Sequence, residues 1–235
     1  MKKLNEWYEL LDWIDVRELH MITLAKNPNP KVIKLISSNI DEIDWYMISS
    51  NENAISILRK YKNKVDWNQL SSNAGAVILL EENQEKIVWE GLSMNQNAID
   101  LLGLNLEKVC WTCLSMNPNA MDLLEANQEK IDWCFLSMNP NPKAINMLSQ
   151  NKNKINWIQL SSNPSAIKLL TENVEKIHWY ELSSNPNAMS LLEKNKGKID
   201  WANVSGNPNA MILLEKNYNK IDWVSLSRNP SLFKL

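Results

Sequence analysis

The sequence predicts an all-α solenoid of about nine tandem 22-residue helix–turn–helix repeats. The first observation is a tryptophan that recurs every 22 residues, with one step of 24 residues. The second is that the residues around each tryptophan return in the same order, as in Lys-Ile-Asp-Trp-x-x-Leu-Ser-x-Asn-Pro-Asn-Ala. Copied short units stack on their neighbours and bury one continuous core. The ladder consists of Trp45, Trp67, Trp89, Trp111, Trp133, Trp157, Trp179, Trp201 and Trp223.

The first helix of each unit is predicted to begin at the Asn-Pro pair. In the copy that starts at Asn117, Asn supplies an N-cap and Pro suits the first helical position. Apolar residues within 120–124 then fall on one helical face. Asn127 is expected to end this helix in a left-handed conformation, which Asn tolerates well. Asn occupies that column in every copy of the ladder except one, where Tyr61 stands.

The second helix is predicted to begin at the Asp before each ladder Trp. Asp132 is a good N-cap, and Ile131 and Leu136 have the spacing of a hydrophobic staple. Trp133 falls on the same side as Leu136, so we expect the Trp ladder to form the buried core. The repeated Ser that follows the Leu is interpreted as a small residue that allows close helix packing. Both helices are too short to be stable alone, so stacking must stabilise them.

The ends of the chain depart from the unit. Residues 1–18 do not fit the repeat and are predicted to form an N-terminal cap helix with an apolar stripe. Residues 19–235 are predicted to be a single elongated repeat domain, whose last copy begins at Asn229 and is incomplete. The stripe consists of Leu4, Trp7, Leu11 and Ile14.

A leucine-rich repeat is the main structural alternative, because its period is similar. That fold requires apolar residues two positions before the Leu and two after the Asn. Here the first of these columns begins with Tyr46 and Asn68, and the second with Asn53 and Gly75. The polar and small residues in both columns favour the helical solenoid.

The repeat pattern Lys-Ile-Asp-Trp-x-x-Leu-Ser-x-Asn-Pro, seen from Lys130 to Pro140, resembles the repeats of Asn/Pro-rich proteins of giant DNA viruses. The resemblance covers roughly residues 19–235. It implies a helical repeat array and, for a viral protein, a place in the host cytoplasm. It supplies no catalytic or binding residues to carry over to this chain.

Bulk properties agree with a cytoplasmic protein that is neither secreted nor embedded in a membrane. The formal net charge is −2, so no global positive field would attract nucleic acid. No apolar run reaches 18 residues, and the first residues lack the apolar stretch of a secretory signal. The three cysteines cannot all pair with one another, which suggests a reducing compartment.

Few residues suggest catalysis or metal binding, and we predict that the protein is not an enzyme and has no cofactor and no metal site. Cys110 and Cys113 match a C-x-x-C pattern, for which a redox pair or half a zinc site is the functional alternative. We interpret this match as coincidental, because both cysteines stand at positions that vary between copies. His20 and His178 stand in the Asp N-cap column, without the nucleophile and orienting acid that a catalytic His requires.

A repeated Lys two residues before each Asp offers a further alternative. Regular positive charges beside a Trp ladder suit single-stranded nucleic acid, and binding of single-stranded nucleic acid is therefore the second alternative. The overall negative charge argues against nucleic acid as the partner. A Lys near the end of the first helix also favours that helix dipole. The column consists of Lys64, Lys86, Lys108, Lys130, Lys154, Lys176, Lys198 and Lys220.

The predicted partner-binding surface lies in the two columns after each Trp, which vary freely between copies. In the middle of the chain their helix face turns apolar, and exposed apolar patches often mark interfaces. We therefore expect a non-enzymatic scaffold that binds an unknown protein partner, with structural self-association, as in a dimer, as the first alternative. The opposite interpretation is that closer packing buries these residues. The predicted patch consists of Gly91, Met94, Cys113, Met116, Cys134, Phe135 and Met138.

Overall fold

The structure is a computed structural model that describes residues 10, 14–15, 17, 19–27 and 29–232. All regular elements in this part of the chain are helices, and successive helices contact one another, which confirms the predicted all-α repeat fold. The chain divides into two compact units, Met1–Leu114 and Ser115–Leu235, which are described separately below. The predicted cap helix over residues 1–18 falls almost entirely outside the described residues.

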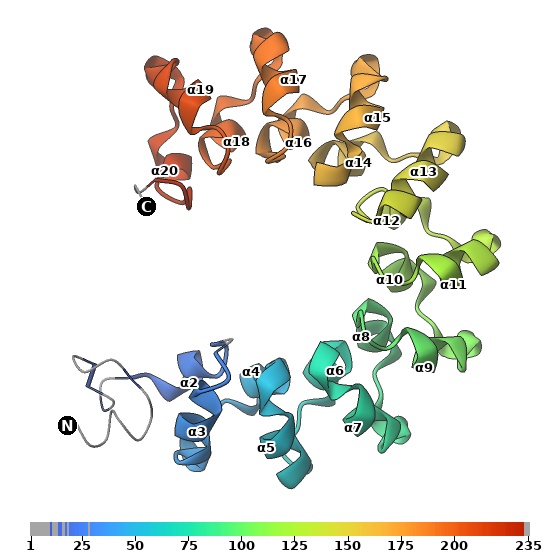
Figure 1. Cartoon of the computed structure of the whole chain (residues 1–235), viewed down its shortest axis with the longest axis vertical. Coiled ribbons are helices and arrows are strands. Elements are labelled where there is room, and N and C mark those ends of the chain that lie inside the picture. Colours follow the sequence, from blue (N-terminus) through green and yellow to red (C-terminus); the bar gives the residue numbers. More distant parts are fainter. Residues whose placement is uncertain (1–9, 11–13, 16, 18, 28, 233–235) are drawn as a thin grey trace. The chain divides into compact units, whose positions relative to one another are not determined.

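Each copy contains one helix that begins at a ladder Trp, here called a Trp helix, and one leucine helix. Within each unit the Trp helices form one row and the leucine helices a second row (Figure 1). Successive Trp helices pack on each other in both units. The first unit contains α4 (Trp45–Ser49), α6 (Trp67–Ser72) and α8 (Trp89–Met94), with α2 (Met21–Leu24) at the same place in an earlier copy. The second contains α12 (Trp133–Leu136), α14 (Trp157–Ser162), α16 (Trp179–Ser184), α18 (Trp201–Ser205) and α20 (Trp223–Leu226), while α10 (Trp111–Met116) includes residues of both units.

The leucine helices are equally short. In the first unit they are α3 (Val32–Ser37), α5 (Ile55–Lys60), α7 (Val77–Glu81) and α9 (Ile99–Gly103). In the second unit they are α11 (Met121–Ala126), α13 (Pro142–Gln150), α15 (Ile167–Thr171), α17 (Met189–Lys194) and α19 (Met211–Glu215). A 3-10 turn that the sequence did not predict follows every leucine helix except α5, as in η5 (Gln84–Lys86) after α7. The buried core consists of the Leu and other apolar side chains of the leucine helices, the repeated Ala at or near the start of most of them, the Ile or Val before the cap position of most Trp helices, and the apolar residue three positions after each ladder Trp.

The predicted start of the leucine helices is confirmed for the Asn cap but not for the α-helix itself. The Asn caps a 3-10 turn that leads directly into the α-helix in η3 (Glu52–Ala54), η4 (Ala74–Ala76) and η9 (Pro164–Ala166). The α-helical part starts about one turn later than predicted. The α-helix begins after the Ala, as α5 does at Ile55, and the side chain of Asn51 accepts the amide N–H of Asn53 at 3.0 Å. Because this bond reaches only two residues ahead, it closes a tight turn instead of an α-helical one. Only α13 begins at its Pro, where two extra residues place Asn141 as the N-cap.

The predicted start of the Trp helices is confirmed. The Asp66 carboxylate accepts the amide N–H of Gln69 at 2.9 Å and thereby caps α6. Where the column holds Val88 or His178, no side-chain hydrogen bond caps the helix. The same cap is made by Asp44, Asp132, Asn156, Asp200 and Asp222.

The Asp222 cap predicts a contribution to stability that depends on pH. The backbone amide of Ser225, 2.7 Å from the carboxylate, holds the pKa of Asp222 below its ordinary value of 3.8. The contribution is therefore fully present above pH 3.8 and is lost as the pH falls through the lower pKa of the folded state. Asp222→Asn keeps a cap acceptor that does not titrate. Unfolding curves from neutral to acidic pH should show wild type losing its advantage over this variant in acid, and a constant difference would contradict the prediction.

Asn follows every leucine helix except α5, which Tyr61 follows, and it ends these helices in a different way from the one predicted. In these copies φ lies between −127° and −140°, so the residue is not left-handed. Instead the Asn83 side chain donates to the Leu79 carbonyl at 2.7 Å and occupies an acceptor that the helix leaves open. The same bond is made by Asn39, Asn105, Asn127, Asn151, Asn173, Asn195 and Asn217.

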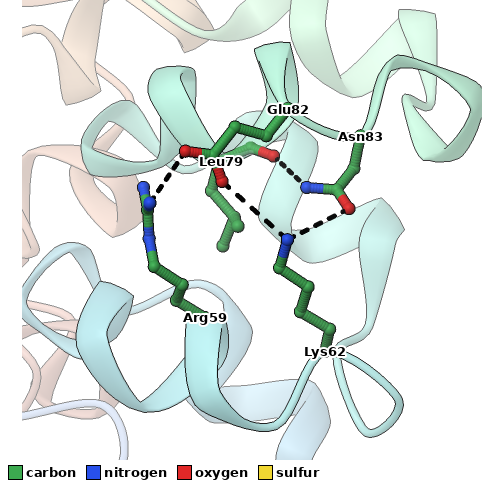
Figure 2. A network of polar contacts seen from close by, with 5 residues as sticks. All are labelled: Arg59, Lys62, Leu79, Glu82 and Asn83. Atoms are coloured by element: carbon green, nitrogen blue, oxygen red, sulfur yellow. Dashed lines mark hydrogen bonds and ion pairs between the residues drawn. The ribbon is translucent and has the colours of Figure 1, made fainter.

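Figure 2 shows how this helix end also contacts the preceding copy. The Asn83 oxygen accepts from Lys62 Nζ at 3.5 Å, and Glu82 forms an ion pair with Arg59 at 2.7 Å. Both partners of that ion pair are exposed, and exposed pairs contribute only about 0–1 kcal/mol. These surface contacts therefore add little to the stacking of the copies.

Candidate interaction surface

A ladder of buried asparagines joins each copy to the one before it. The Asn185 side chain donates to the carbonyls of Ser161 and Asn163, both at 3.0 Å, while its oxygen accepts the amide N–H of Asn187 at 3.0 Å. The side chain is only 1% exposed, so these bonds satisfy backbone groups that water cannot reach. The same bridge to a Ser carbonyl of the preceding copy is made by Asn73, Asn95, Asn139, Asn163, Asn207 and Asn229.

A second ladder is formed by the buried serines at or near the C-terminal ends of the Trp helices. The Ser183 hydroxyl donates to the Trp179 carbonyl at 2.8 Å and accepts the amide N–H of Asp200 at 3.0 Å. The sequence indicated only a small residue here, but the hydroxyl itself joins two copies. An amide of the following copy is accepted in the same way by Ser49, Ser71, Ser93, Ser115, Ser137, Ser161 and Ser205.

The prediction that the Trp ladder forms the buried core was wrong. Every ladder Trp is partly exposed, and Trp223 is 54% exposed. Trp is the first residue of its helix and lies at the edge of the packed row, whereas the residue three positions on, such as Leu70 after Trp67, is fully buried. The ladder residues are Trp45, Trp67, Trp89, Trp111, Trp133, Trp157, Trp179, Trp201 and Trp223.

Several lysines of the repeated column lie over the Trp of the preceding copy. Lys154 Nζ is 4.3 Å from the ring centre of Trp133, within the range of a cation–π interaction. Lys64, Lys108 and Lys220 lie similarly over Trp45, Trp89 and Trp201, at 5.3, 4.9 and 4.8 Å. These lysines thus have a structural partner within the repeat array.

Lys154→Met should lower the free energy of unfolding by about 0.5–1 kcal/mol, because it keeps the aliphatic stem and removes the cation above Trp133. Lys154→Arg, which keeps the charge, is the matched control and should stay near wild type. Urea denaturation followed by circular dichroism measures both. Equal losses in the two variants would show that the charge over the ring contributes nothing.

The residues of the predicted patch differ in their exposure. In the first unit Gly91 is buried, Met94 is 49% exposed and Cys113 is partly buried. A side chain at position 91 would meet the backbone oxygen of Asn68 at 3.2 Å, so Gly91 serves helix packing. In the second unit Met138 is 37% exposed, and the others are partly buried, namely Met116, Cys134 and Phe135.

The second unit carries an apolar row outside the predicted patch, at the position directly after the last four ladder Trp residues. Ile158, Tyr180 and Val224 are 49%, 55% and 68% exposed, and Ala202 between them is exposed as well. These four residues, here called the apolar row, lie on α14, α16, α18 and α20, which pack consecutively. The sequence showed that this column is variable, but not that it is the more exposed of the two columns beside each Trp.

The corresponding column of the first unit is mostly polar. Tyr46 is 55% exposed, and the copies after it carry Asn68, Glu90 and Thr112, which are also exposed. Burial of a polar side chain costs free energy, so this column is less suited to an apolar partner. The two units therefore present different chemistry at the same repeat position.

The described residues contain no group of three or more His, Cys, Asp or Glu that would hold a metal ion. His178 is exposed, with its ring 6.3 Å from that of Tyr180. No helix of the described part is long and apolar enough to cross a membrane. Comparisons with protein families, with curated proteins and with solved structures found no match.

Proposed function

We propose that the protein is a non-enzymatic repeat scaffold that binds a protein partner through the apolar row of its second unit. This proposal rests on one observation, a difference in burial between the residues that join the copies and the residues that vary from copy to copy. The Asn and Ser ladders that join the copies are buried, whereas the apolar row is exposed and differs from copy to copy. The row can therefore vary without disturbing the bonds that define the repeat.

The chemistry of the row suits a protein interface. Tyr is enriched among the residues that contribute most to interface energetics, and exposed aliphatic side chains beside it add apolar area that a partner can bury. With helices about 8–10 Å apart, four consecutive Trp helices present a row on the order of 30 Å long. A helix or an extended segment with apolar residues along one side matches that length and chemistry.

Binding of single-stranded nucleic acid is less well supported. A base that stacked on Trp133 or Trp201 would have to displace the lysine that already lies over the ring. The apolar row offers no positive charge to a phosphate backbone, and the formal net charge is −2. The surface thus favours a protein partner, either a different chain or a second copy of this one.

The test compares partner capture by wild type with capture by the double variant Ile158→Lys/Tyr180→Lys. Ile212, which is 65% exposed on the leucine helix α19, provides the matched control Ile212→Lys. Tagged full-length proteins are returned to the source cell, and bound proteins are quantified by mass spectrometry. We expect wild type and Ile212→Lys to retain the same partner and the double variant to lose it.

Light scattering on the same three purified proteins identifies self-association. A dimer that disappears only in the double variant would make a second copy the partner. Capture by the double variant at the wild-type level would contradict the proposal, provided that its circular dichroism spectrum matches that of wild type.

A further inference from the structure

Two of the three cysteines lie side by side in the first unit. The sulfur atoms of Cys110 and Cys113 are 2.8 Å apart, and both residues are partly exposed. The third cysteine, Cys134, belongs to the second unit. The sequence interpretation treated the C-x-x-C pattern as chance, but the structure brings the two sulfurs into direct contact.

The geometry of the repeat itself creates this contact. Cys110 occupies the cap position that Asp holds in most copies, and its sulfur accepts the amide N–H of Cys113 at 3.4 Å. In α6 the Asp66 carboxylate accepts the Gln69 amide in the same way. The cap thus aims the side chain of position 110 at residue 113. The Ser93 hydroxyl also accepts the Cys110 amide at 3.0 Å, which fixes the backbone there.

We propose that Cys110 and Cys113 are a redox modification site, a dithiol that converts reversibly to an intrahelical disulfide by exchange with a small-molecule disulfide such as oxidised glutathione. The Cys110 thiolate attacks one sulfur of the oxidant, forms a mixed disulfide and releases one glutathione thiolate. Cys113 gives its proton to that thiolate, and its sulfur attacks the Cys110 sulfur. The second glutathione leaves as a thiolate and takes up from water the proton that Cys110 had released, so two electrons pass from the cysteine pair to the oxidant and reduce it to two thiols.

The two sulfurs have different roles in this exchange. Burial, followed by the hydrogen bond with Cys110, the charge of Cys110 and the negative charge of Glu90, raises the pKa of Cys113 to about 12. Cys113 therefore keeps its proton at neutral pH while Cys110 is reduced. In the mixed disulfide the Cys110 sulfur carries no charge and no longer takes part in this hydrogen bond, so Cys113 can release its proton and act as the resolving sulfur. Because thiolates and not thiols attack disulfides, Cys110 is the sulfur that reacts first.

The test equilibrates the full-length protein with defined mixtures of reduced and oxidised glutathione, blocks the remaining thiols by alkylation and analyses peptides by mass spectrometry. We expect the peptide that contains both Cys110 and Cys113 to become lighter by two hydrogen atoms and to lose alkylation. Cys134 should remain alkylated in the same mixtures and serves as the internal control thiol. Reduction should restore alkylation of the pair.

Two variants separate the roles of the sulfurs. Cys113→Ser should stop at the mixed disulfide, seen as one glutathione attached to Cys110, whereas Cys134→Ser should behave as wild type at the pair. Alkylation of Cys110 and Cys113 to the same extent as Cys134 in every mixture would overturn the proposal. Bound glutathione on the wild-type pair without the lighter peptide would overturn it as well.

Discussion

Replacement of Asn185 by alanine is expected to lower the free energy of unfolding by about 3–5 kcal/mol, the largest effect of any single substitution discussed for this chain. The variant removes the donor to the Ser161 and Asn163 carbonyls and the acceptor of the Asn187 amide. Each buried group that loses its partner costs about 1–3 kcal/mol, and the truncated side chain leaves a cavity as well.

Asn187→Ala is the matched control for this substitution. Asn187 belongs to the same copy and its side chain also donates to a carbonyl of the preceding copy, that of Pro164 at 3.0 Å, but the residue is exposed. Water can replace that bond, so the loss should stay below about 1 kcal/mol. Urea denaturation monitored by circular dichroism compares the two, and similar losses would show that burial of the Asn ladder is not what stabilises the stack.

Ser183→Ala is expected to lower the free energy of unfolding by about 1–3 kcal/mol, although it removes a single oxygen atom. The Ser183 hydroxyl is fully buried and accepts the amide N–H of Asp200, which begins the next copy. Alanine fits the same space but leaves this amide without that acceptor. If the sequence-based interpretation were sufficient and only small size mattered, alanine would be tolerated without loss.

The next residue in the chain gives the control. Ser184 is exposed, and its hydroxyl donates to the Glu181 carbonyl at 2.8 Å within its own helix. Ser184→Ala should therefore change the unfolding midpoint little. Hydrogen exchange at the Asp200 amide, which should become faster only in Ser183→Ala, identifies the lost bond directly. Unchanged exchange at that amide would contradict the assigned role of Ser183.

The parts of the fold that depend on local signals were predictable from the sequence. The Asp cap and the apolar face of each helix involve residues within one copy, and the Trp helices begin where Asp66 and its counterparts indicate. Asn185 and Ser183 bond to residues of a neighbouring copy, so their roles depend on stacking geometry that the sequence does not display. The exposure of the Trp ladder depends on the same geometry, and a general preference for buried Trp gave the wrong answer.

The candidate surface was predictable only in part. The sequence identified the two variable columns beside each Trp, because free variation shows which residues do not define the repeat. It could not show that Tyr180 and Ile158, in the first of these columns, are exposed side chains. The contact between Cys110 and Cys113 was also hidden, since it depends on the cap geometry that places residue 110 against residue 113.

Buried polar ladders define the repeat and leave the apolar row free for recognition. The most direct test replaces the row of the second unit by polar residues of the kind found in the first unit, in the quadruple variant Ile158→Asn, Tyr180→Glu, Ala202→Thr and Val224→Asn. The measured quantity is the free energy of unfolding. We predict a value within about 1 kcal/mol of wild type, since exposed substitutions each change stability little. A loss of several kcal/mol would show that the row is part of the core and would contradict the account.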